Sequence, residues 1–227
     1  MNPKTRPPVE KVSGFMIAAN YLPLVYILAG VAVVAGLPWT IGQQVTAALV
    51  WVYLVPPVVA RIVLITLGAP VARDAAPATR AYKVWWLLTQ LQMPFNRLPV
   101  LEELLRLIPT AYPLWLNLWG ARASLFVYWA PGVLITDRYL LDAGHGAVIG
   151  TRAIVSGHLA TRGPDGGHRL TVARVVVEPG AVIGAHAGIG PGCRIAAGEM
   201  VPAGRLLPPF TVWESGRKQR PAGTAAP

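Results

Sequence analysis

Branched aliphatic residues recur at every sixth position over residues 177 to 204, and this period constrains the fold more than any other feature of the chain. The positions are Val177, Ile183, Ile189, Ile195 and Val201. An α-helix repeats its faces about every 3.6 residues and a strand about every two residues. A period of six therefore requires short straight segments of equal length that are joined by regular corners.

Small residues and glycines follow the same period. Ala181, Ala187 and Cys193 each stand two positions before an aliphatic residue. The recurring glycines are Gly180, Gly192, Gly198 and Gly204. Together the three rows predict a left-handed parallel β-helix with three flat sides per turn. The aliphatic side chains point to its axis, and glycine supplies the backbone angles of the corners.

The same frame begins upstream and is interrupted once. Its earlier members are Ala143, Ile149 and Val155. The last of them lies twenty-two residues before the next aliphatic row, which is not a multiple of six, so a glycine-rich loop at residues 159–170 is the expected interruption. We therefore predict a β-helix domain over residues 135–227. We also predict a homotrimer of parallel β-helices, because association covers flat sides that one short coil leaves exposed.

The N-terminal half has a different chemistry. Hydrophobic residues make up 54% of the chain, charged residues make up 13%, and the mean hydropathy is +0.48, which is unusual for a soluble domain. No charged residue lies between Lys11 and Arg61. Residues 15–37 and 45–67 are each long enough to cross a membrane as a helix. We therefore predict a transmembrane hairpin over residues 15–70 and an α + β fold for the chain.

The second apolar segment is expected to kink. Pro56 and Pro57 have no amide hydrogen to donate to the helix ladder. Arg61 is then expected near the interface or against protein, because an unpaired arginine in lipid is costly.

Basic residues flank the two apolar segments. A basic tail over residues 1–14 precedes the first segment, and Arg73, Arg80 and Lys83 follow the second. The positive-inside rule therefore predicts a multi-pass inner-membrane protein whose termini and β-helix are cytoplasmic. A cleaved signal peptide, which would export the rest of the chain, is the alternative. The net charge of +10 suits an anionic lipid or an anionic cofactor, and no nucleic-acid partner is expected because aromatic and basic residues do not interleave on one surface.

Residues 71–134 combine aromatic and leucine clusters with basic residues and prolines. This mixture predicts short amphipathic helices at the membrane interface. The tryptophans concerned are Trp85, Trp86, Trp115 and Trp119. They would suit the headgroup layer, or alternatively a packed collar between the membrane and the soluble part.

The C-terminal region resembles the hexapeptide-repeat acyltransferases. The resemblance covers about residues 135–221 and includes the repeat, a histidine at the start of a protruding loop, and the closing "VWESGRKQRP". A weaker similarity is to the membrane-spanning C-terminal part of polylysine-synthetase-like nonribosomal peptide synthetases, on "ATRAYKVWWL", "LNLWGARASLFVYWAPGVLITDRYLLDAGHGAVIG" and "SGHLATR". The resemblance implies transfer of an acyl group, typically acetyl, from acyl-CoA to a hydroxyl or amine, without a metal. Proximity to the bilayer favours a lipid-linked or membrane-delivered acceptor.

His158 matches the histidine of that family and is the predicted general base. An imidazole, with a reference pKa of about 6.5, can accept a proton near neutral pH. His186 also stands at a corner of the coil and is a candidate for the same cleft from an adjacent subunit. Asp165 is a candidate for fixing the tautomer of the base, although an aspartate in "GPDGG" also suits a turn.

Basic residues gather where the resemblance places the edge that binds CoA. We predict that this rim meets the phosphates of the cofactor, whereas each member taken alone also suits a solvated surface. The candidates are Arg162, Arg174, Arg205, Arg217 and Lys218, with Arg169 and Arg220 nearby.

Two other functions stay open at the level of sequence. A γ-type carbonic anhydrase would bind zinc through three histidines from two subunits, and His158, His168 and His186 are numerous enough. A catalytically inactive, membrane-bound trimeric scaffold is the non-enzymatic alternative.

Overall fold

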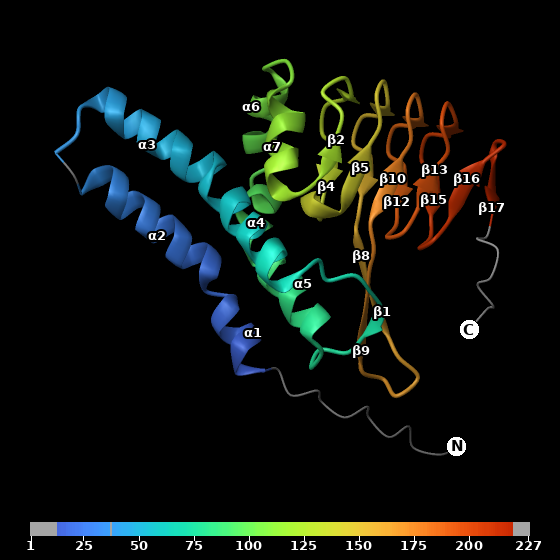
Figure 1. Cartoon of the computed structure of the whole chain (residues 1–227), viewed down its shortest axis with the longest axis horizontal. Coiled ribbons are helices and arrows are strands. Elements are labelled where there is room, and N and C mark those ends of the chain that lie inside the picture. The colour runs from blue at the N-terminus through green and yellow to red at the C-terminus, as the bar shows by residue number, and fades with distance from the viewer. Residues whose placement is uncertain (1–12, 37, 220–227) are drawn as a thin grey trace.

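The computed structural model describes residues 13–36 and 38–219. Helices occupy the N-terminal half and parallel strands the C-terminal half, so the mixed α + β composition is confirmed (Figure 1). Most of the basic tail, with Lys4, Arg6 and Lys11, lies outside the described residues, as does Arg220.

Four helices form an apolar hairpin that projects away from the strands (Figure 1). They are α1 (Gly14–Ala19), α2 (Leu22–Ala35), α3 (Ile41–Tyr53) and α4 (Val55–Leu67). Two continuous stretches, Gly14–Ala35 and Ile41–Leu67, are long and apolar enough to cross a membrane. Because a core helix or a signal sequence satisfies the same criterion, the finding concerns length and composition only.

Tyr26 and Trp51 join the two arms of the hairpin. The Tyr26 hydroxyl donates to the Trp51 carbonyl at 2.7 Å, and the Trp51 indole donates to the Tyr26 carbonyl at 3.1 Å. A Cβ at position 30 would lie 2.5 Å from the Trp51 indole nitrogen, so Gly30 is needed for this approach. The arms are therefore fixed by one reciprocal aromatic contact.

The predicted break in the second segment is confirmed, and it lies at Leu54, between α3 and α4. The indole of Trp115 donates to the Tyr53 carbonyl at 2.8 Å, beside the break. Beyond it, the Arg61 guanidinium lies 3.1 Å from where a Cβ at Gly120 would stand. The Arg61 guanidinium therefore approaches the backbone at Gly120, although the residue is exposed.

Three further helices lie between the hairpin and the strands (Figure 1). They are α5 (Arg80–Arg97), α6 (Val100–Arg106) and α7 (Ala111–Trp119). Trp85, Trp115 and Trp119 are buried, and Trp86 is half-buried. The packed-collar alternative, and not the headgroup layer, therefore accounts for the three buried tryptophans.

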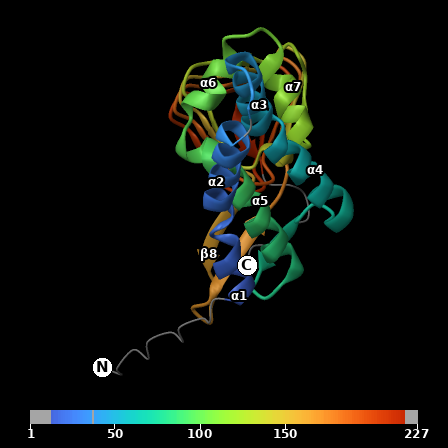
Figure 2. The same cartoon turned by 90° about the vertical axis from the view of Figure 1, so that its left-hand side faces the viewer.

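The C-terminal half winds through three parallel sheets in turn (Figures 1 and 2). The first sheet contains β2 (Arg122–Ala123), β5 (Leu141–Ala143), β10 (Val175–Val177), β13 (Arg194–Ile195) and β16 (Val212–Glu214), closed by the antiparallel β17 (Arg217–Gln219). The second contains β3 (Tyr128–Trp129), β6 (Val148–Ile149), β11 (Val182–Ile183) and β14 (Met200–Val201). The third contains β4 (Leu134–Ile135), β7 (Ile154–Val155), β12 (Gly188–Ile189) and β15 (Leu206–Leu207). Val176 pairs with Arg194, so one turn takes eighteen residues, or three hexads.

The inward positions follow the predicted period of six. All five aliphatic residues of residues 177 to 204 are at most 2% exposed, and the small residues two positions earlier are fully buried. The inward row continues to Leu207 and Trp213. The row of inward residues also begins before residue 135, where the sequence predicted the coil to start. Ala123 pairs with Ala143, and Trp129 pairs with Ile149, so these two residues belong to an earlier turn.

The expected interruption is an antiparallel hairpin. It consists of β8 (His158–Arg162) and β9 (His168–Val172), and β1 (Ala72–Ala75) pairs with β9 as a third strand. The segment that follows the apolar hairpin is therefore attached directly to the loop that the coil projects.

Candidate functional site

His158 and Asp137 form a hydrogen-bonded pair at one corner of the coil. His158 follows β7 and Asp137 follows β4, so each stands just past the third sheet, in successive turns. The His158 Nδ1 atom lies 2.6 Å from Oδ2 of Asp137. Because Ile135 pairs with Val155, Asp137 lies beside Gly157 of the next turn, one residue before His158.

Four donors converge on the buried Asp137 carboxylate. Oδ2 accepts from the Thr136 hydroxyl at 2.7 Å, the Gly157 amide at 3.0 Å and His158 Nδ1. Oδ1 accepts from the Trp85 indole at 3.2 Å. Because the carboxylate accepts at Nδ1, we assign the imidazole hydrogen to that atom, which leaves the lone pair on Nε2.

Close packing fixes this arrangement. A Cβ at Gly157 would lie 2.9 Å from the Asp137 Cβ and 2.8 Å from Leu140, so no larger residue fits there without displacing the carboxylate. The Trp85 ring lies 4.8 Å from the His158 ring, centroid to centroid. Helix α5 therefore supplies both a hydrogen bond and a packing surface to the pair.

The two side chains of the pair differ in exposure. The Asp137 side chain is 0% exposed, whereas that of His158 is 26% exposed. Within residues 13–36 and 38–219, no hydrogen-bond partner lies at His158 Nε2. The His158 side chain is therefore partly open to solvent.

Asp165 lies elsewhere. It stands at the tip of the β8–β9 hairpin, where its carboxylate binds Arg169 at 2.6 Å. The Gly167 amide, followed by Arg169, lowers the pKa of Asp165. The structure does not bring Asp165 to His158, and Asp137 occupies the position beside the imidazole. Asp137 was absent from the sequence prediction, although it follows Ile135 by two residues, as Gly157 follows Val155.

His186 stands at a different corner of the coil. It lies between β11 and β12, where the second sheet meets the third, and it is exposed with φ of 58°. His145 lies at the corner between the first and second sheets, against Phe126. Neither residue contacts His158 within one chain.

The predicted phosphate-binding residues have different surroundings. Arg174 is held by Asp142 at 2.5 Å and by the Tyr139 carbonyl at 3.0 Å. Arg205 lies over the Trp213 ring at 5.9 Å. Three of the predicted residues are exposed on the hairpin or on β17, namely Arg162, Arg217 and Lys218. The exposed side chains can meet an anion, whereas the Arg174 guanidinium is already bound to Asp142 and to the Tyr139 carbonyl.

A buried cluster of charged side chains lies next to the corner that carries Asp137. Arg138, which follows Asp137, is fully buried and pairs with Glu102 of α6. Gln92 of α5 accepts from the Arg138 amide at 2.8 Å. Burial raises the pKa of Tyr112 well above its usual range, so its hydroxyl stays protonated and donates to Glu102. Hydrogen bonds and ion pairs therefore join helices α5, α6 and α7 to Arg138, the residue that follows Asp137. We call the pair formed by His158 and Asp137 the dyad.

In the described part of the chain, no group of three histidine, cysteine, aspartate or glutamate side chains is arranged to hold a metal ion.

Comparisons with known proteins find acetyltransferases among solved structures. No family model and no curated protein matches the chain. The chain is similar to a galactoside acetyltransferase in complex with coenzyme A, at 16% identity over 53% of this chain and 76% of that chain, with a TM-score of 0.29. It is also similar to the serine acetyltransferase of Neisseria gonorrhoeae, at 18% identity over 90% and 76%, with a TM-score of 0.21. Serine acetyltransferase isoform 3 of Entamoeba histolytica, in complex with cysteine, gives 12% identity over 99% and 88%, with a TM-score of 0.24. Similarity this low assigns no residue, so the roles of the side chains rest on their geometry.

Proposed function

We propose that this protein transfers an acyl group, most simply acetyl, from CoA to a hydroxyl or amine of a membrane-associated acceptor. The observation that carries the proposal is the pair formed by His158 and the buried Asp137, with Nε2 of the histidine free and partly exposed. This is the arrangement that a general base needs, because the carboxylate orients the imidazole and stabilises its cationic form.

The transfer moves one proton from the acceptor, through His158, to the CoA sulfur, and the imidazole ends in the neutral form in which it began. The acceptor gives its proton to His158 Nε2 as its oxygen or nitrogen attacks the thioester carbonyl. The carbon–sulfur bond then breaks, and the CoA sulfur takes the proton from the imidazolium. Asp137 keeps Nδ1 protonated throughout.

Acyl-CoA is proposed as the donor because exposed cations surround the loop and the end of the coil. We propose Arg162, Arg205, Arg217 and Lys218 as contacts of the CoA phosphates. Arg174 would act with them only by leaving Asp142. His186 would reach the site only from a neighbouring subunit, and we propose no metal in the reaction.

We propose that the apolar hairpin of residues 15–70 spans the inner membrane, with the termini and the coil on the cytoplasmic side. The exposed apolar side chains of Gly14–Ala35 and Ile41–Leu67 support this placement. The proposed domain order is basic tail, membrane hairpin, collar helices and a left-handed coil that carries the acyltransferase site.

A homotrimer is proposed from the outward side chains of the coil. The second sheet presents Tyr128, Val148, Val182 and Met200 in one paired row. The third presents Leu134, Ile154, Gly188 and Leu206. The first sheet instead presents Arg122, Asp142 and Arg194 among its outward residues. A closed threefold assembly uses two different surfaces of each subunit, and two apolar faces beside one charged face meet that need.

Val182→Glu is expected to break the trimer, because it places a charge in the centre of an apolar face. The measurement is the protein mass by light scattering after gel filtration in detergent. Val176→Glu is the matched control, since Val176 lies on the first sheet between Asp142 and Arg194. Wild-type protein of monomer mass, or a Val182→Glu variant that stays trimeric, would contradict the proposed assembly.

His158→Ala tests the proposed function itself. Removal of a general base is expected to lower the rate of CoA release about 10²- to 10⁴-fold, while acetyl-CoA still binds. Binding is followed by calorimetry and release by a thiol reagent, on protein in nanodiscs. Equal rates of CoA release for the two proteins would exclude His158 as the base, and failure of both to bind acyl-CoA would favour the inactive scaffold.

A further inference from the structure

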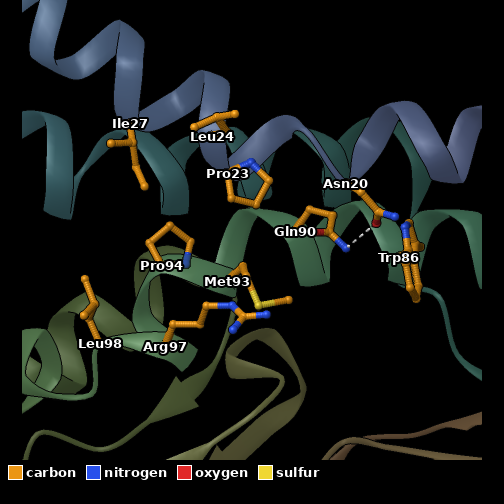
Figure 3. A pocket seen from close by; sticks show the side chains of 10 residues that line it. All are labelled: Asn20, Pro23, Leu24, Ile27, Trp86, Gln90, Met93, Pro94, Arg97 and Leu98. Carbon is orange, nitrogen blue, oxygen red and sulfur yellow. Dashed lines mark hydrogen bonds between the residues drawn. The ribbon is translucent and has the colours of Figure 1, made fainter.

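An open groove of about 650 Å³ lies between the apolar hairpin and α5 (Figure 3). Leu24 and Ile27 of α2 line one side, and Met93 and Pro94 of α5 line the other. Leu24 and Ile27 are about half exposed although they are large and apolar, at 53% and 50%. Among residues 13–36 and 38–219, the groove is therefore an apolar surface that no other side chain fills.

Three polar side chains interrupt this apolar lining. The Gln90 amide donates to the Asn20 side chain at 3.3 Å, so these two groups satisfy each other (Figure 3). Arg97 also lines the groove, near the end of α5, and its side chain is exposed. No acidic residue is among the lining residues, and the described chain gives Arg97 no ion pair. The groove thus combines an apolar wall with an arginine side chain for which the described residues supply no ion-pair partner.

Two adjacent tryptophan side chains connect the groove to the proposed base. Trp86 lines the groove, and its ring centroid lies 5.7 Å from that of Trp85. The Trp85 ring in turn lies 4.8 Å from the His158 ring. Both indoles belong to α5, so one helix borders the groove on one side and the dyad on the other.

We propose that this groove binds a phosphate-bearing lipid, with an acyl or prenyl chain along α2 and α5 and the phosphate at Arg97. An apolar chain covers the exposed side chains of Leu24 and Ile27, and the planar guanidinium matches the geometry of a phosphate. The binding of a lipid in this groove does not depend on the proposed acyl transfer. Its role as the acyl acceptor does depend on that proposed function. The membrane-spanning position proposed for α2 gives such a lipid direct access.

The test is native mass spectrometry of the full chain in detergent, titrated with dioleoyl phosphatidic acid. Arg97→Gln is expected to weaken binding about tenfold or more, the size of one lost charge-assisted contact. Dioleoylglycerol, which has the same chains without phosphate, is expected to bind wild type and Arg97→Gln equally. Lys83→Gln is the matched control, because Lys83 lies on the same helix but outside the groove lining.

Leu24→Trp provides a second variant, in which a larger side chain fills the groove and both lipids are expected to bind more weakly. Equal losses for Arg97→Gln and Lys83→Gln would overturn the inference, since binding would then follow overall charge. Unchanged binding in Leu24→Trp would overturn it as well. His158→Ala is expected to bind the lipid as wild type does. If the wild-type protein binds the lipid but transfers no acyl group, the proposed function is refuted and the lipid-binding groove still stands.

Discussion

Asp137→Asn is expected to lower kcat for acyl transfer about 10³- to 10⁴-fold while the lipid affinity stays unchanged. The Asp137 carboxylate accepts from His158 Nδ1 at 2.6 Å. An asparagine amide can instead donate to Nδ1, which moves the imidazole hydrogen to Nε2 and removes the lone pair that takes the acceptor's proton. In a serine protease triad, the same change costs about 10⁴ in kcat by this route. The measurement is the initial rate of CoA release at saturating acetyl-CoA.

Asp165→Asn is the matched control for that result. Asp165 binds Arg169 at the tip of the hairpin, away from the imidazole, so its substitution is expected to change kcat less than about threefold. A larger loss for Asp165→Asn than for Asp137→Asn would contradict the assignment of the orienting carboxylate. Thermal unfolding of both variants, followed by circular dichroism, separates a loss of chemistry from a loss of fold.

Glu102→Ala is expected to destabilise the protein by about 3–5 kcal/mol, because it leaves the buried Arg138 guanidinium without its ion-pair partner. Arg138 then retains only the neutral acceptors Gln92 and Asn96. The expected loss is the penalty of an unpaired buried charge rather than the net value of the pair. Reversible denaturation of the detergent-solubilised protein measures the change in the free energy of unfolding.

Glu178→Ala is the control for this prediction. Glu178 pairs with Arg194 on the surface of the coil, where the arginine side chain is 45% exposed, so its loss is expected to cost about 1 kcal/mol or less. A Glu102→Ala variant as stable as Glu178→Ala would show that the collar does not depend on the buried cluster. The two outcomes differ by several times the usual error of such measurements.

The period of six residues predicted the coil well because every inward side chain packs along the same axis and must therefore be apolar. The five residues of the row are all buried, as a three-sided coil requires, namely Val177, Ile183, Ile189, Ile195 and Val201. The first turn escaped the prediction because Ala123 and Trp129 occupy inward positions without being branched aliphatic residues. Neighbouring leucine and aromatic residues there also fit an amphipathic helix.

The carboxylate beside His158 was missed for a related reason. Asp137 meets His158 because two successive turns stack, and the sequence interval between them depends on the 3₁₀ turn Arg138–Leu140. Turn geometry of this kind is not encoded in a hydrophobic period. The role of Trp85 depends on how α5 packs against the coil, and a tryptophan in an amphipathic helix suits a membrane surface as well as a protein core.

The most direct test of acyl transfer follows the acyl group itself. The wild-type protein in membranes is supplied with acetyl-CoA labelled with ¹³C in the acetyl group, and mass spectrometry follows the lipid fraction while a thiol reagent follows CoA. We predict one labelled acetyl ester or amide on a membrane-associated acceptor for each CoA released, and neither product with His158→Ala. Label recovered only as free acetate, or the same labelled product from His158→Ala, would contradict acyl transfer by this dyad.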